Sequence, residues 1–365
     1  MIKVLQVLNG LVRGGAQTFI INNVPALYEK GIICDFLVRR SDGVYSDLIQ
    51  QYYGKIIVTA SFPRHFLHNY IQTEKFFEQH GFEYSAVHVH ANALLYVLPL
   101  ILAKRVGIPI RIIHSHNTKT NIPYLKFLHE LNKKRVSKWA NVFLACGQDA
   151  GHWMFDNKHF NVINNCIDEQ LFRYSEFNRK MVRNRYKVPD DYLLIGHVGA
   201  FRPQKNHVFL LNVYKEYLNM NRKTKLILLG TGIIENEIRE LSKSLGLEDD
   251  VVFAGSQDNI HQYYHAMDVF LFPSLFEGLP FALIEAQMSG LKIIASDQIT
   301  DECIKTDLVQ KMSLNSSYVN WANMIELISN RAVRREKYAR IVSDAGYGIR
   351  YSSEKLYEIY NNALL

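Results

Sequence analysis

Short apolar runs alternate with longer amphipathic stretches through the first half of the chain. Each run ends in a polar or glycine-containing turn, and a helical pattern follows. This rhythm predicts βα units that build a parallel sheet. The first helix is expected from about Ala16 to Glu29, and the predicted strands read IKVLQVLN, ICDFLVR, KIIVTA, AVHVH, IRIIHSH and VFLACG.

The pattern is interrupted near residues 161–168 and restarts after a polar, charged stretch. The second series of strands reads LLIGHVGA, KLILLGTG, VVFAGS, DVFLFPS and KIIAS. We therefore predict an α/β protein with two Rossmann-like, doubly wound domains, at residues 1–165 and 166–347. A last helix, at about 348–365, could pack back on the first domain.

Composition is that of an ordinary globular protein. Hydrophobic residues make up 48% of the 365 positions and charged residues 21%, which excludes a disordered chain. The longest apolar run, residues 93–103, is about half the length of a membrane-spanning helix. The N-terminus reads as a first strand and not as a signal peptide, so we expect a cytoplasmic protein. The scattered cysteines fit reduced thiols better than a disulfide framework or a zinc site; they are Cys34, Cys146, Cys166 and Cys303.

The net charge of +7 is unevenly distributed. Residues 1–165 contain 18 Lys and Arg against 10 Asp and Glu, and the remainder contains 24 against 25. The positive excess is either a solvated basic face or a means of attraction to an anionic membrane or lipid diphosphate. Because the basic residues are dispersed and no nucleic-acid-binding motif is present, we expect no nucleic-acid partner.

Ligands of open α/β sheets bind beyond the carboxyl ends of the strands. Two such domains therefore predict a site in a cleft between them, lined by the loops that follow strands. In the first of these loops, Gly14 and Gly15 precede a helix, whose free N–H groups and dipole could face an anion. A tight turn needed only for packing explains the pair equally well.

Two histidine pairs end the fourth and fifth predicted strands. His88 and His90 alternate along one strand, as His114 and His116 do along the next, so each pair points to one side of its strand. No carboxylate or cysteine lies near in sequence to complete a metal site, and a polar lining of the cleft is the preferred interpretation. His116, at the very end of its strand, is best placed to meet a substrate.

The second half has further strand–loop–helix corners. Arg202 and Lys205 lie together before a helix, as binding of a diphosphate would require. An exposed basic loop is the alternative. Residues 230–232 form a glycine corner after the next strand.

Two carboxylates flank a predicted helix start in LFEGLPFALIEAQMSG. Pro280 suits the first turn of a helix, which places Glu277 in the preceding loop and Glu285 inside the helix. The amides between them could bind an oxygen-rich group, so a nucleotide sugar, with hydroxyls at both ends and phosphates in the middle, fits this layout. A structural loop and helix surface is the alternative.

Several segments together resemble family 4 of the retaining glycosyltransferases, which have the GT-B fold. The segment FEGLPFALIEAQMSG resembles that family's E-x7-E motif. HSHNT, IGHVGAFRPQKNH, AMDVFLFPSLFEGLP and IEAQMSGLKIIASDQIT resemble its capsular- and exopolysaccharide-synthesising branch in Gram-positive bacteria. The likeness covers nearly the whole chain, with the motifs in the family's order.

The resemblance implies roles for individual residues. Glu285 would bind the nucleotide ribose, Glu277 a hydroxyl of the donor hexose, and His116 would face the donor sugar and acceptor. Lys205 would neutralise the diphosphate with help from the Gly14-Gly15 loop. The backbone from Gln257 to Ile260 would hold the uracil, and amides would contact hexose and diphosphate along Gly278, Leu279, Pro280 and Phe281. No metal and no other cofactor are expected.

Two positions depart from the family's pattern. The arginine that usually follows the first strand of the second domain is replaced by Ala200, and Arg202 could supply its charge. A glycine of the interdomain motif is replaced by Cys166.

The resulting hypothesis is transfer, with retention, of a hexose or N-acetylhexosamine from a UDP-sugar. The acceptor would be an undecaprenyl-diphosphate-linked glycan at the inner face of the cell membrane, with the basic segment YLKFLHELNKKRVSKWA favouring that surface. A plain packed helix is the alternative for this segment. A GT-B-fold UDP-sugar epimerase and a non-catalytic partner of another transferase remain as alternative functions.

Overall fold

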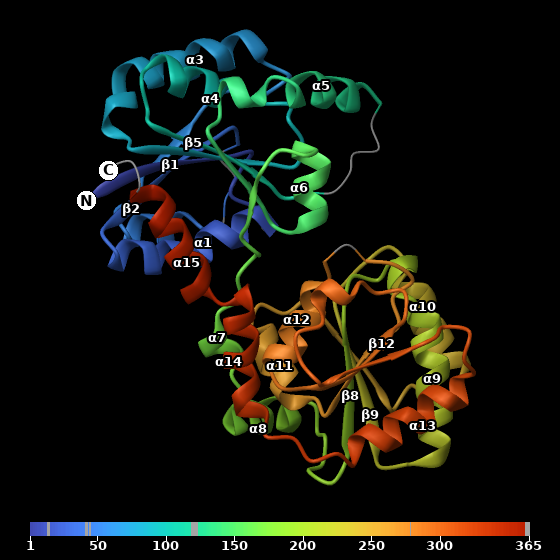
Figure 1. Cartoon of the computed structure of the whole chain (residues 1–365). Coiled ribbons are helices and arrows are strands. Elements are labelled where there is room, and N and C mark those ends of the chain that lie inside the picture. The colour runs from blue at the N-terminus through green and yellow to red at the C-terminus, as the bar shows by residue number, and fades with distance from the viewer. Residues whose placement is uncertain (13–14, 41–42, 44, 118–122, 278, 362–365) are drawn as a thin grey trace. The chain divides into compact units, whose positions relative to one another are not determined.

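The chain folds as two α/β units. The computed structural model describes residues 1–12, 15–40, 43, 45–117, 123–277 and 279–361. Unit 1 contains Met1–Ile167 and Gly346–Leu365, and unit 2 contains Asp168–Ala345. The predicted domain boundaries, 165 and 347, compare with 167 and 345 in the structure. Each unit contains one doubly wound parallel sheet (Figure 1), so the predicted fold class is confirmed.

The sheet of unit 1 has seven strands in the order β3-β2-β1-β4-β5-β6-β7. Since β2 and β4 lie on opposite sides of β1, the direction of winding reverses between β1 and β4. The two-residue strand β7 was not predicted, because two residues carry no periodicity. The strands are β1 (Ile2–Leu8), β2 (Ile32–Val38), β3 (Ile56–Val58), β4 (Ala86–Ala91), β5 (Ile110–Ser115), β6 (Val142–Ala145) and β7 (Asn161–Val162).

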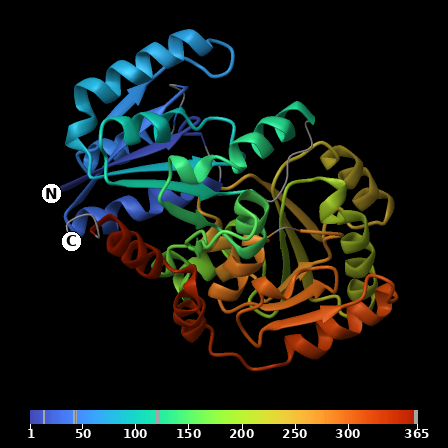
Figure 2. The same cartoon turned by 45° about the horizontal axis from the view of Figure 1, so that its top comes forward.

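Helices cover both faces of this sheet (Figures 1 and 2), which is why strands β1 and β2 are buried along most of their length. One face packs against α1 and α15, and the other against α3, α4 and α6. The helices of unit 1 are α1 (Gly15–Glu29), α2 (Ser46–Gln51), α3 (Phe66–His80), α4 (Leu98–Arg105), α5 (Pro123–Lys133), α6 (Gln148–Phe155) and α15 (Ile349–Asn361).

The last helix, α15, belongs to unit 1 although unit 2 separates it in sequence from the rest of that unit. Its buried Leu356 joins the core under α1, and the Ser352 hydroxyl donates to the Asn23 side chain at 2.7 Å. The hydroxyl of Tyr360 accepts a hydrogen bond from Gln6 at 3.1 Å. The end of the chain is thus part of the core of the first unit.

Unit 2 repeats the architecture with six strands in the order β10-β9-β8-β11-β12-β13, and the winding reverses between β8 and β11. The strand β13 was not predicted, since only half of its short sequence is apolar. The strands are β8 (Leu193–Val198), β9 (Thr224–Leu229), β10 (Val251–Gly255), β11 (Val269–Phe272), β12 (Lys292–Ser296) and β13 (Val309–Met312).

The helices of unit 2 also lie on both faces of their sheet (Figure 1). Buried side chains of α9, α10 and α13 pack on one face around Trp321. The helices are α7 (Glu169–Phe172), α8 (Glu176–Arg185), α9 (His207–Met220), α10 (Glu235–Ser244), α11 (Ile260–Ala266), α12 (Phe281–Met288), α13 (Tyr318–Ser329) and α14 (Tyr338–Val342).

The turn at Cys166 needs no glycine. The cysteine is buried, and among the described residues it is not one with a positive φ angle. Its sulfur lies 3.1 Å from the Asn23 side-chain amide. The departure from the family's glycine is therefore accommodated within unit 1 by ordinary packing.

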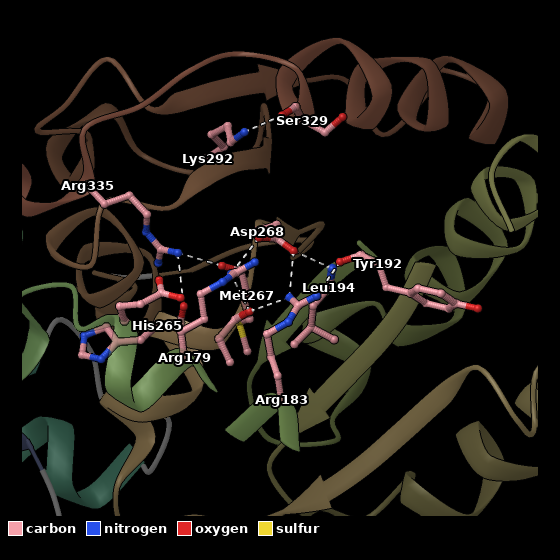
Figure 3. Close-up of polar contacts among 12 residues, drawn as sticks. Arg179, Arg183, Tyr192, Leu194, His265, Met267, Asp268, Lys292, Ser329 and Arg335 are labelled. Carbon is pink, nitrogen blue, oxygen red and sulfur yellow. Dashed lines mark hydrogen bonds and ion pairs between the residues drawn. The ribbon is translucent and has the colours of Figure 1, made fainter. Parts of the chain in front are cut away.

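A cluster of charged side chains joins the helix ends of unit 2 (Figure 3). Asp268 accepts from Arg179 at 2.8 Å and from Arg183 at 3.1 Å, and Arg183 is almost fully buried. Arg335 donates to carbonyls at the C-terminal ends of α11 and α12, and Lys292 donates to the Ser329 carbonyl at the end of α13. Cations placed on these carbonyls offset the negative ends of the helix dipoles.

We predict that Asp268→Asn destabilises unit 2 by about 3–5 kcal/mol, because it leaves the buried guanidinium of Arg183 without an anionic partner. Chemical denaturation of the full chain measures the change. Asp191→Asn is the control: it breaks an exposed ion pair with Lys223, and little change is expected. Equal losses of unfolding free energy in the two variants would show that the buried ion pair contributes no more to stability than the exposed one.

Candidate active site

The loops of unit 2 converge where the winding of its sheet reverses. The loops after β8 and β11 leave neighbouring strands at their carboxyl ends, and such a reversal is where open α/β sheets bind ligands. Backbone contacts tie the two loops together. The Leu275 amide donates to the Gln204 carbonyl at 2.9 Å, and the Asn206 side chain donates to the Pro273 carbonyl at 3.2 Å.

An ion pair joins these loops at the site. Lys205 Nζ lies 2.7 Å from Glu277 Oε1, with only 18% and 9% of the two side chains exposed. Gln204 Nε2 donates to the other carboxylate oxygen at 3.2 Å. The structure thus brings together two of the predicted catalytic residues, and their opposite charges neutralise each other.

Glycines allow this close packing. Gly230 has φ +132°, and a Cβ on it would lie 2.2 Å from the Gly199 carbonyl oxygen. A Cβ on Gly199 would in turn lie 3.1 Å from Cδ of Lys205. The Lys205 side chain therefore passes over Gly199, where no side chain stands between it and Glu277.

The start of α12 supplies amides beside Glu277. Pro280 is the N-cap residue and the helix begins at Phe281, so the predicted position of the proline is off by one. The amides of Phe281 and Ala282 belong to the first turn, which has no intrahelical acceptors. Leu279 lies in the loop just before them, and the predicted contact at Gly278 lies outside the described residues.

Glu285 sits in α12, one turn after the helix start. It accepts a hydrogen bond from the hydroxyl of Tyr264 at 2.9 Å. Burial raises the pKa of the Glu285 carboxyl to about 7, although the Tyr264 hydrogen bond acts in the opposite direction. The carboxylate therefore changes charge near neutral pH.

The predicted uracil-binding segment follows β10, an edge strand of the sheet of unit 2. Gln257 follows β10, and its side-chain amide donates back to the Ala254 carbonyl. Ile260 is the first residue of α11, one turn before Tyr264. Through Tyr264 this helix is linked to Glu285.

Arg202 does not join the ion pair. Its side chain is exposed, and its guanidinium forms no ion pair with any described residue. Ala200 has no group that could replace the missing arginine. Lys205 is held in the site by its ion pair with Glu277. That Arg202 supplies the charge of the missing arginine remains a prediction.

Unit 1 contains a cavity of about 780 Å³ at its own reversal of winding, between the ends of β1 and β4. Its wall includes Gly15, the first residue of α1, and His116. The Gln17 side chain donates to the Gly10 carbonyl at 3.0 Å, which links α1 to the residues that follow β1. The predicted contact at Gly14 lies outside the described residues.

The four predicted histidines form a hydrogen-bonded array. The rings of His88 and His90 stack at 4.2 Å between centroids, and those of His114 and His116 lie 4.1 Å apart. Hydrogen bonds join the pairs across the strands, at 3.2 Å between His88 and His114 and at 2.9 Å between His90 and His116. Nitrogen atoms of His88, His90 and His114 lie within 4.8 Å of one another, but stacked rings do not aim their lone pairs at one point.

The Gln6 side chain sets the direction of these bonds. Its oxygen accepts from Nε2 of His90 at 3.0 Å, so the other nitrogen of that neutral ring, Nδ1, is an acceptor. Nε2 of His116 consequently donates to it, which leaves Nδ1 of His116 as an acceptor. The geometry gives that atom no hydrogen bond among the described residues, although the nearby Asn165 side chain acts on the same ring. Nδ1 can therefore accept a hydrogen bond from a ligand hydroxyl.

Burial keeps the array uncharged. It lowers the pKa of His116 to about 3, and the pKa values of the other three imidazoles are also lowered well below their usual range. His116 therefore stays neutral at physiological pH, and its role is to orient a hydroxyl and not to supply a proton.

The chain is similar to known glycosyltransferases in sequence. Residues 178–311 match the family described as "Glycosyl transferases group 1". The chain is 32% identical to the Bacillus subtilis (strain 168) protein named "Putative glycosyltransferase EpsF", with 98% of this chain and 96% of that protein covered. It is 24% identical to the Escherichia coli UDP-Gal:alpha-D-GlcNAc-diphosphoundecaprenol alpha-1,3-galactosyltransferase, over 61% of this chain and 60% of that enzyme.

The fold is also similar to that of solved structures. HepE of Anabaena in complex with UDP has a TM-score of 0.76 at 17% identity, with 99% of this chain and 100% of that chain covered. At this identity the likeness concerns the fold alone. It confirms the predicted GT-B fold.

Some residues of the site escaped sequence reasoning. Tyr264 and Gln6 lie inside an ordinary helix and an ordinary strand, and only their partners make them notable. Gln204 stands beside a predicted site residue, and its polar side chain in a strand-following loop was an available signal.

Glu285→Gln should stabilise the protein at alkaline pH. The folded-state pKa of about 7 lies above the ordinary value of 4.5, so ionisation of the unfolded chain lowers the stability as the pH rises from about 4.5 to about 7. The variant should be more stable than the wild type by about 1–3 kcal/mol at pH 8, and this difference should vanish at about pH 4. Thermal denaturation across this range measures the difference, with the exposed Glu240→Gln as control. A difference that is independent of pH would refute the raised pKa.

Proposed function

The chain belongs to the group 1 glycosyl transferases, and from this premise we propose a specific reaction. The enzyme transfers a hexose or N-acetylhexosamine from a UDP-sugar to a lipid-diphosphate-linked glycan, in the synthesis of an exopolysaccharide or capsule. Relatives support the two substrates: the E. coli relative is named for UDP-Gal and a diphosphoundecaprenol acceptor. The Bacillus subtilis relative, which matches this chain along nearly its whole length, carries a name associated with exopolysaccharide synthesis.

Unit 2 binds the donor in this proposal. The ionised carboxylate of Glu285 accepts from the ribose hydroxyls, and the backbone from Gln257 to Ile260 holds the uracil. Glu277 accepts from a hydroxyl of the hexose. Lys205 and the free amides at the start of α12 stabilise the diphosphate, a role suited to a helix N-terminus. The observation that carries the proposal is the Lys205–Glu277 ion pair at the switch point of this sheet.

The reaction proceeds with retention. The acceptor oxygen attacks the anomeric carbon from the face that UDP leaves, the bond from that carbon to the phosphate oxygen breaks, and the acceptor proton passes to the departing phosphate. Lys205 and the helix start stabilise the charge that develops on UDP, so no metal is required. Glu277 orients the sugar and forms no covalent bond to it.

Unit 1 binds the acceptor. Nδ1 of His116 accepts a hydrogen bond from a sugar hydroxyl in the cavity beside it. Because this imidazole is neutral, it can orient the hydroxyl without competing for its proton as a strong base would.

A donor screen and a variant test the proposed function. UDP-Glc, UDP-Gal, UDP-GlcNAc and UDP-GalNAc are compared by thermal shift, and the best donor is then assayed for slow hydrolysis and for transfer to a lipid-linked acceptor. Glu277→Gln should lower both rates about 10²–10³-fold and retain UDP binding, since UDP lacks the hexose. NMR of the product should show the donor's anomeric configuration.

Other outcomes identify other functions. Stabilisation by GDP-sugars alone would refute the donor assignment. Conversion of the UDP-sugar to its epimer without an acceptor would indicate an epimerase. Donor binding without hydrolysis or transfer would indicate a non-catalytic partner.

The helix α5 favours a membrane-facing acceptor. Its side chains Phe127, Leu128 and Leu131 are exposed although apolar, and the exposed Lys126 and Lys134 flank them. Apolar side chains beside lysines are typical of helices that lie on anionic membranes. No described helix is long and apolar enough to cross a membrane.

Phe127→Ser combined with Leu131→Ser should weaken binding to phosphatidylglycerol vesicles about tenfold, because each loses an inserted apolar side chain. Vesicle sedimentation measures the binding of each variant. Phe177→Ser, at an equally exposed phenylalanine of unit 2, is the control and should have no effect. Unchanged binding of the double variant would exclude α5 as the membrane contact.

A further inference from the structure

An unpaired cation faces the cavity of unit 1. Arg39 follows β2 directly, and its backbone amide donates to the Asn9 carbonyl at 3.2 Å, which joins the loops after β1 and β2. Its side chain forms part of the cavity wall together with Tyr96 and His116. Arg39 therefore stands at the same sheet edge as the proposed acceptor site.

The guanidinium of Arg39 has no polar partner in the described part of the chain. Its Nε is buried without a hydrogen bond, and no ion pair is formed by the side chain. The residues that line the cavity include no aspartate or glutamate. The Arg39 side chain is half-buried, and this burial lowers the pKa of its guanidinium.

Three other inward-facing arginines have polar partners for their guanidinium groups, although Nε of Arg183, like that of Arg39, is buried without a hydrogen bond to any described residue. Arg183 donates to Asp268 and to three backbone carbonyls, and Arg335 donates to four carbonyls. Arg111 donates to the carbonyls of Ile108, Pro109 and Trp139. Arg39 is half-buried, and unlike these arginines its side chain has no carboxylate or carbonyl partner among the described residues. Partial withdrawal of an unpaired charge from water costs free energy, and a partner that binds from solution would offset this cost.

The side chain is also held in place. Its guanidinium carbon lies 4.2 Å from the ring centre of Tyr96, a cation–π contact. The Tyr96 hydroxyl is within 3.2 Å of the Thr73 hydroxyl, which donates to the Asn69 carbonyl at 2.7 Å. The ring is thus a fixed platform, and the guanidinium is preorganised to bind an anion.

We propose that Arg39 binds an oxyanion of the acceptor, a phosphate or a carboxylate group, inside the cavity of unit 1. This inference rests on the proposed function, since it concerns the acceptor of that reaction. A guanidinium forms two parallel hydrogen bonds with either group. Because His116 lines the same cavity, the oxyanion is on the sugar that receives the transfer or is linked directly to it. The acceptor is therefore a sugar diphosphate or an acidic sugar, and a neutral sugar is a poor substrate.

Three acceptors with one sugar in common test this: a prenyl-diphosphate sugar, the matching uronic acid glycoside, and the neutral alkyl glycoside. The wild type should prefer one of the two anionic acceptors, which also identifies the source of the oxyanion. Arg39→Gln should lower kcat/KM for that acceptor about 100-fold and leave transfer to the neutral glycoside unchanged. Arg64→Gln, at an exposed arginine of the same unit, is the control.

Two further readouts separate this inference from folding and from the proposed function. Since the Arg39 side chain has no polar partner among the described residues, Arg39→Gln should not lower the Tm; a large fall would overturn the inference. UDP-sugar hydrolysis should be unchanged in the variant, and its absence in the wild type would refute the proposed function instead. In that event, pyrophosphate binding at constant ionic strength and saturating UDP still tests Arg39. Equal use of neutral and anionic acceptors, or equal pyrophosphate binding by wild type and variant, would refute the oxyanion site.

Discussion

The reversal of winding next to the first strand of each sheet determines where chemistry can occur. Parallel strands are buried on both faces, so the chain returns through helices, and the strand ends are the places where polar side chains can gather. In unit 2 the reversal brings Lys205 to Glu277, and in unit 1 it opens the cavity beside His116. Both half-sites follow from one topological constraint that is applied twice.

Withdrawal from water then decides the state of each group. The histidine array remains neutral because it is buried, and Gln6 decides which nitrogen of His116 can accept a hydrogen bond. Glu285 keeps a carboxylate that is only marginally ionised at neutral pH, so a ligand that donates hydrogen bonds to it would favour its charged form. In the proposed reaction a bound ligand would add a hydrogen bond to each of these groups.

Sequence reasoning could find the residues that stand at strand ends, because that position follows from periodicity and polarity alone. Glu277, Lys205 and His116 were found in this way, and the fold class followed from the alternation of strands and helices. Contacts between distant segments could not be found. The hydrogen bond from Tyr264 to Glu285, and the isolation of Arg39 on Tyr96, depend on packing that no local pattern records.

The backbone of Ala200 lies where two loops of unit 2 pack closely. The loop after β9 approaches so closely that Gly230 can have no side chain, and its built Cβ would also lie 3.4 Å from the Ala200 amide nitrogen. Lys205 meanwhile passes over Gly199 to Glu277. A lysine is a point charge on a flexible stem, whereas an arginine is a rigid fork. In the proposed reaction, with alanine at 200, neutralisation of a donor diphosphate would depend on a lysine whose charge can move from Glu277 to the phosphates.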